Sequence, residues 1–174
     1  MRDRRRVLLS RIRWMLALFL LGLVLSGLTA FPLEGEISLV ARWFGVSEEV
    51  PPAAYGGVQR WIATVHQGIR DTHARYPFMA YGTDWLAFAH LVIAVAFIGP
   101  LCDPVRNLWV LSFGLIACVL VVPVALICGP IRGIPWYHQL VDCSFGVAGF
   151  IPLWFCRKWA CELEVGGKLV TRPE

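Results

Sequence analysis

Residues 108–131 read LWVLSFGLIACVLVVPVALICGPI, and this uncharged stretch decides the fold. Two other stretches share its character: residues 14–31 carry no charge, and residues 85–102 are interrupted only by His90. A helix rises 1.5 Å per residue, so about 20 apolar residues cross the ~30 Å hydrocarbon core of a bilayer. Apolar runs of this length predict helices that are buried on all sides, and three of them in one short chain indicate burial in lipid.

A fourth span is expected near the C-terminus. The uncharged residues 143–156 alone would cover only about 21 Å, but a helix that starts at Trp136 would cover about 31 Å. Pro135 would then lie at the start of the helix, where its missing N–H is tolerated, and Trp136 would lie at the level of the lipid headgroups. This extension draws His138 and Asp142 into the membrane.

The sequence therefore predicts an all-α integral membrane protein, a bundle of four transmembrane helices. The predicted spans are 14–31, 84–102, 108–128 and 136–156, with Thr83, Asp84 and Asp103 placed to cap helix starts. The connections are a long loop at 32–83 and short turns at 103–107 and 129–135, and the terminal segments are 1–13 and 157–174. In the long loop, apolar residues at helical spacing predict an amphipathic helix over 58–76, and a shorter one is expected over 36–44.

The distribution of arginine predicts the orientation. Basic residues gather in segments 1–13 and 157–174, and the positive-inside rule then places both termini in the cytoplasm and the long loop outside. Arginine outnumbers lysine 14 to 2, a bias typical of GC-rich bacterial genomes, so a bacterial inner membrane is expected. The basic residues lie at membrane borders, where anionic lipid accounts for them, and no nucleic-acid partner is expected.

The first apolar stretch has an alternative interpretation as a cleaved signal peptide. Its apolar core is longer than the usual 7–15 residues. If cleavage followed Ala30, Leu28 would occupy position −3, where a small residue is required. We therefore expect this helix to be retained as a span.

No familiar catalytic or nucleotide-binding motif occurs in the sequence, which lacks a P-loop and the patterns GxGxxG, CxxC, HExxH and GxSxG. The six cysteines have no spacing typical of metal ligands, and they are expected to act as small apolar residues without forming a disulfide.

The candidate site consists of polar residues in the outer half of the membrane. His90 is expected about 7.5 Å inside span two and Asp142 about 9 Å inside span four, so we predict that they face each other, with His138 one turn above Asp142. Ionisable residues at this depth are unfavourable and often functional. Two interpretations remain open. Either His90, His138 and Asp142 form a ligand site capped by His66 or His73, or they are polar contacts that hold helices together.

These patterns favour an accessory, assembly or scaffold subunit of a membrane complex, more readily than an enzyme. Its partners would be the lipid bilayer and other membrane subunits or further copies of itself. A first alternative is a redox protein that holds haem, metal or quinone at the outer leaflet, with His90 and His138 as ligands. A second alternative is a small transporter that acts as an oligomer.

Overall fold

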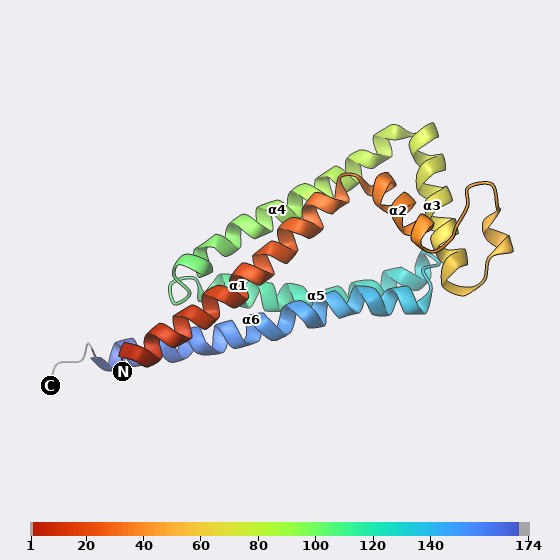
Figure 1. Cartoon of the computed structure of the whole chain (residues 1–174). Coiled ribbons are helices and arrows are strands. Elements are labelled where there is room, and N and C mark those ends of the chain that lie inside the picture. The colour runs from red at the N-terminus through yellow and green to blue at the C-terminus, as the bar shows by residue number, and fades with distance from the viewer. Residues whose placement is uncertain (1, 171–174) are drawn as a thin grey trace. The chain divides into compact units, whose positions relative to one another are not determined.

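The computed structural model describes residues 2–170, with side chains described for residues 3–166 (Figure 1). The described residues are mostly helical (87%) and contain no strand, which confirms the all-α prediction. The elements in chain order are α1 (Arg2–Ala30), α2 (Leu33–Trp43), η1 (Pro52–Ala54), α3 (Gly57–Arg75), η2 (Pro77–Met79), α4 (Ala80–Cys102), α5 (Leu108–Ile131) and α6 (Trp136–Val170). The last four residues of the predicted tail, and Met1, lie outside the described residues.

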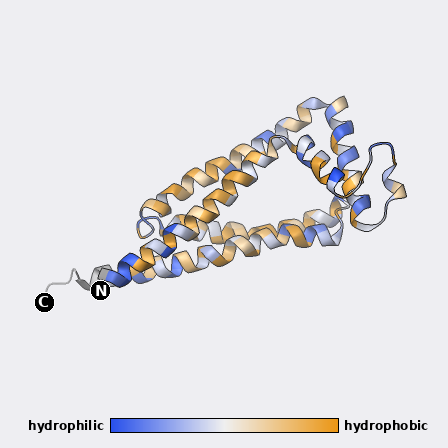
Figure 2. Cartoon of the chain, viewed as in Figure 1, coloured by the Kyte–Doolittle hydropathy of each residue, from blue (hydrophilic) through white to orange (hydrophobic). Residues whose placement is uncertain are grey.

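Four segments of this chain are helical, long and apolar enough to cross a membrane, as the sequence predicts. Hydrophobic residues recur along all four in Figure 2, and hydrophilic residues gather at the start of α1 and on α3. The four segments are Asp3–Ala30, Pro77–Cys102, Leu108–Ile131 and Trp136–Gly166.

Three predicted helix caps are wrong. Helix α4 begins at Ala80, so Thr83 and Asp84 lie inside its first turns, and the Thr83 hydroxyl donates to the Ala80 carbonyl at 2.7 Å. Asp103 does not cap α5, which begins five residues later. Its Oδ1 instead accepts the backbone N–H of Arg106 at 3.1 Å and closes the turn between α4 and α5.

Two compact units divide the chain, and each is described by itself. Unit 1 comprises Met1–Gly22 and Ile93–Glu174, and unit 2 comprises Leu23–Val92. Unit 1 therefore contains α5, α6, the first part of α1 and the last part of α4. Unit 2 contains α2, α3 and the remaining parts of α1 and α4.

In unit 1, the start of α1 runs antiparallel to the end of α6. The Arg4 guanidinium lies 3.4 Å from the Glu162 carboxylate, and the Cys156 thiol lies 3.8 Å from the Ile12 carbonyl oxygen. Residue numbers thus rise along α1 while those of its contacts on α6 fall, as in an antiparallel pair. Phe19 brings α4 to this pair, because its ring centroid lies 4.8 Å from that of Phe97. The fully buried side chains of this core include Ile12, Leu16, Phe97, Leu111, Leu153 and Cys156.

Glycines allow the helices of unit 1 to approach closely. A Cβ on Gly146 of α6 would lie 2.6 Å from the backbone oxygen of Cys118 on α5. A Cβ on Gly114 of α5 would lie 2.6 Å from the Phe97 ring. Small residues at such positions let helix backbones pack together where lipid provides no hydrophobic driving force.

In unit 2, α2 and α3 form a small helical pair with its own core. The core consists of Ala41, Val46, Ile62 and Ala63, with Val40 and Tyr55 packed against it. The end of α2 creates this arrangement: Gly45 has φ +68°, its N–H donates to Arg42, and the N–H of Val46 donates to Ala41 at 2.8 Å. These bonds form a Schellman motif, which turns the chain back so that Val46 packs beside Ala41.

Candidate functional site

The structure places His90 on α4, within unit 2. Its Nδ1 lies 2.8 Å from the carbonyl oxygen of Leu86, one turn earlier. A carbonyl oxygen can only accept, so Nδ1 carries the proton and Nε2 keeps its lone pair in the neutral ring. Histidines that bind metals commonly show this arrangement, because the backbone bond fixes the tautomer and the ring orientation. His90 also lies beside α1: a Cβ on Gly27 would approach its Cβ to 3.1 Å.

His138 and Asp142 lie one turn apart on α6, within unit 1. His138 Nε2 is 3.9 Å from Asp142 Oδ1, and both side chains are partly exposed. The predicted pairing of His90 with Asp142 joins residues of different units, and it stays a prediction.

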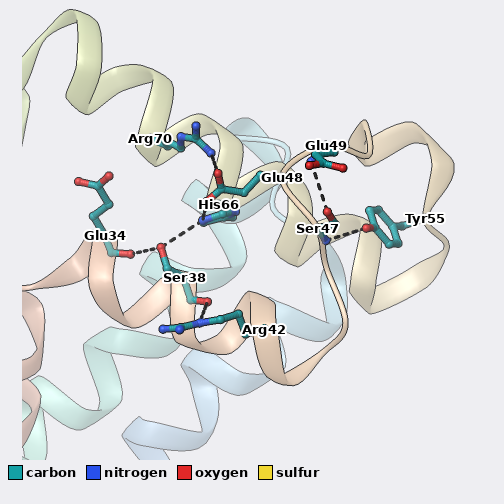
Figure 3. A network of polar contacts seen from close by, with 9 residues as sticks. All are labelled: Glu34, Ser38, Arg42, Ser47, Glu48, Glu49, Tyr55, His66 and Arg70. Carbon is teal, nitrogen blue, oxygen red and sulfur yellow. Dashed lines mark hydrogen bonds and ion pairs between the residues drawn. The ribbon is translucent and has the colours of Figure 1, made fainter.

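His66 and His73 lie on α3 and face different partners in unit 2. His66 is buried, and its Nε2 lies 3.1 Å from the hydroxyl of Ser38 on α2 (Figure 3). His73 is half exposed, and its Nε2 lies 3.8 Å from a carboxylate oxygen of Glu34. Each histidine therefore contacts α2 separately, two turns apart.

The best-connected polar network of unit 2 is centred on His66. The Ser38 hydroxyl donates to the Glu34 carbonyl at 2.7 Å, so it accepts a hydrogen bond from His66 Nε2–H. Glu48, in the loop after α2, forms an ion pair with Arg70 and has Oε1 4.0 Å from His66 Nε2 (Figure 3). The network thus joins α2, α3 and the loop between them.

The same loop is held by a second set of bonds. The Tyr55 hydroxyl accepts the backbone N–H of Ser47 at 2.8 Å, and the Gln59 amide donates to the Phe44 carbonyl at 2.8 Å (Figure 3 shows the first). These bonds close the loop on itself and tie its start to α3.

Ser38, His66 and Glu48 resemble a serine–histidine–carboxylate triad in composition but differ from it in geometry. A triad needs the serine proton to face one ring nitrogen and the carboxylate to face the other. Here the Ser38 hydroxyl donates its proton to the backbone carbonyl of Glu34, and Ser38 and Glu48 both approach the same ring nitrogen of His66, Nε2. The arrangement stabilises the packing of three segments and does not activate a nucleophile.

A cavity of about 350 Å³ lies beside the network. Three carboxylates and one guanidinium line it, so carboxylates dominate its charge. No group of three or more histidine, cysteine or acidic side chains in the described part of the chain is placed to hold a metal ion. The lining residues are Val46, Ser47, Glu48, Glu49, Val50, Pro51, Pro52, Ala63, His66, Gln67, Arg70 and Asp71.

Sequence reasoning identified His66 and His73 but missed Glu34, Ser38 and Arg70. A signal was present in the spacing of these residues. Glu34 and Ser38 are four apart on α2, and His66, Arg70 and His73 recur at intervals of four and three on α3. Such spacings place polar side chains on one face of each helix, and two such faces can pair.

Comparisons with protein families, with curated proteins and with solved structures find no match to this chain. The features of this chain that bear on function are the packed α2–α3 pair, the polar network that joins its two helices, and the polar residues of α4 and α6.

Proposed function

We propose that this chain is a multi-pass membrane protein that acts as a non-catalytic accessory, assembly or scaffold subunit, with residues 33–76 as its docking module. The observation that carries the proposal is the geometry around His66. The hydrogen bond of His66 to Ser38 joins α3 to α2, and the neighbouring ion pair of Glu48 with Arg70 joins the loop to α3, as a preformed recognition surface requires. Preorganised surfaces bind more tightly because less conformational entropy is lost on association.

The docking surface we propose is the α2 ridge, formed by Leu39 and Trp43. Trp43 is 76% exposed, and Leu39, one turn earlier, is 41% exposed. Tryptophan is among the residues that contribute most binding energy at protein interfaces. The ridge would suit an apolar groove on another membrane subunit.

We further propose that the chain lies in a bacterial inner membrane with both termini in the cytoplasm. The basic residues at the start of α1 and after Cys156 support this orientation through the positive-inside rule. Reporter domains fused at residue 104 and at the C-terminus are expected to be active only as cytoplasmic reporters, and one at residue 55 only as an external reporter. A C-terminal reporter found outside would contradict four spans.

Photo-cross-linking tests the docking role. A photoreactive phenylalanine analogue at Trp43 is expected to give a discrete higher-mass protein adduct in native membranes. The same analogue at Trp14, which lies near the middle of α1 and is 70% exposed, is the matched control and is expected to give none. If both positions label lipid alone, the α2 ridge lies in the bilayer interface and the docking proposal fails.

A second candidate function has one specific observation in its favour. The Nδ1 bond of His90 leaves Nε2 able to ligate haem or a metal, or to receive a proton from a quinol. The visible spectrum and metal content of the purified protein distinguish the two candidates. A haem band or a stoichiometric metal that is lost in His90→Ala, and retained in His73→Ala, would replace the accessory role with a redox role.

A further inference from the structure

The arginines at the start of α1 form two sets with different surroundings. Arg4 pairs with Glu162 at 3.4 Å, and the Arg11 guanidinium lies 5.9 Å from the centre of the Trp159 ring, so both face α6. Arg5 and Arg13 lie on another face, in a stripe with Leu9 at intervals of four residues. This second set has no ion-pair partner among the residues with described side chains.

The second set lines a cavity of about 520 Å³ in unit 1. Arg106, from the turn between α4 and α5, joins Arg5 and Arg13 in its wall, so arginines reach the cavity from two separate elements. Its size falls within the range of about 300–1,000 Å³ that is typical of small-molecule sites. The complete lining is Arg5, Leu9, Arg13, Cys102, Asp103, Pro104, Val105, Arg106, Leu163 and Glu164.

The charge of the cavity favours an anion. Its wall carries three guanidinium groups and two carboxylates. The Asp103 carboxylate accepts the backbone N–H of Arg106 at 3.1 Å, and the guanidinium groups outnumber the carboxylates of the wall. Guanidinium groups bind phosphate oxygens through paired N–H donors, which makes arginine well suited to a phosphate.

The position of the cavity indicates a lipid phosphate. Leu9, Val105 and Leu163 make part of its wall apolar. Trp14, one residue after Arg13, is 70% exposed, and Trp109, three residues after Arg106, is 74% exposed. Tryptophans with this exposure at the ends of apolar stretches mark the headgroup level of a bilayer. A smaller hollow of about 270 Å³ adjoins the same stripe and is lined by Arg6, Leu9, Ser10, Arg13 and Trp14.

We propose that this cavity is a binding site for the phosphate headgroup of an anionic phospholipid, with Arg5, Arg13 and Arg106 as its ligands and Leu9, Val105 and Leu163 against the glycerol and upper acyl chains. Basic pockets between membrane helices bind such headgroups. The site is independent of the docking role of residues 33–76, so each proposal can fail alone.

The test measures lipid binding to the purified full-length protein in a neutral detergent, by native mass spectrometry. Phosphatidylglycerol, phosphatidylcholine and inorganic phosphate are the three probes. The variant Arg5→Gln/Arg13→Gln is compared with Arg4→Gln/Arg11→Gln, which removes the same charge from the same helix outside the cavity. Arg106→Gln, on the turn, is a second variant that leaves α1 intact.

We expect one phosphatidylglycerol to bind the unmodified chain in preference to phosphatidylcholine, with no competition from millimolar phosphate. Each cavity arginine contributes about fivefold in affinity, so the double variant loses about 25-fold and Arg106→Gln about fivefold. The control variant changes affinity less than about threefold.

Three outcomes would overturn the proposal. Equal losses in the two double variants would mean diffuse attraction between charges. Equal binding of phosphatidylcholine would mean that the headgroup charge is not recognised. Saturable binding of phosphate that displaces the lipid would assign the cavity to a free anion. Helical circular dichroism is recorded for every variant, and if the double variant does not fold, Arg106→Gln decides the result.

Discussion

Gly146→Ala is expected to destabilise the folded chain by up to about 2 kcal/mol, although alanine is the better helix former by about 1 kcal/mol. The new Cβ would lie 2.6 Å from the carbonyl oxygen of Cys118, and a backbone atom cannot rotate away as a side chain can. Helices α5 and α6 would have to separate, and overpacking of this kind costs about 1–3 kcal/mol. The thermal unfolding midpoint in detergent, followed by tryptophan fluorescence, should fall by several degrees.

Gly22→Ala is the matched control for this prediction. A Cβ at Gly22, in the middle of α1, would meet nothing within 4 Å, so only the gain in helix propensity remains. Its midpoint is expected to stay constant or to rise slightly. Equal shifts in the two variants would contradict the close approach of α5 and α6.

His66→Ala is expected to destabilise the α2–α3 pair by about 2–3 kcal/mol. The substitution removes the partly buried hydrogen bond to Ser38 and the packing of the buried His66 ring, and effects of this kind are each about 1–3 kcal/mol. The loop that carries Glu48 and Glu49 should therefore open more often. A glutamate-specific protease should cleave it roughly 30-fold faster or more, since about 2 kcal/mol corresponds to that factor.

His73→Ala provides the comparison, because it makes the same chemical change on the same helix. The His73 side chain is half exposed, and its contact with Glu34 at 3.8 Å is exposed too, so the expected loss is below about 1 kcal/mol. Cleavage should be accelerated no more than about fivefold. If the two variants are cleaved at similar rates, the network around His66 does not hold the loop.

The four apolar helices could be predicted from the sequence, because a long uncharged run identifies a membrane span without any information about the helices that pack beside it. Residues 108–131 are an example: this uncharged stretch coincides with helix α5, of which residues 108–128 were expected to form the span. The helix ends were harder to predict, since charge ends an apolar span without ending a helix. Helix α6 accordingly continues past Arg157 to Val170, where good helix formers such as Lys158, Glu162 and Glu164 follow.

The polar network could be predicted only in part. Histidine identity and position were enough to select His66 and His73, but their partners depend on how the chain turns after α2. That turn rests on the left-handed conformation of Gly45, which brings Val46 back to Ala41 and Glu48 back to α3. A single backbone conformation of this kind decides which side chains meet, and no periodicity in the sequence reports it.

The pairing of the first helix with the last has a consequence for the order of assembly during synthesis. Unit 2 is contained in Leu23–Val92, so its contacts can form while the ribosome is still translating α5. Arg4 meets Glu162 across 158 residues, and Ile12 meets Cys156 across 144, so unit 1 must wait for α6. At about 5–20 residues per second, translation of the remaining chain after Val92 takes roughly 4–16 seconds. During that interval Ile12 lacks its contact with Cys156, and lipid or the insertion machinery can cover this face of α1.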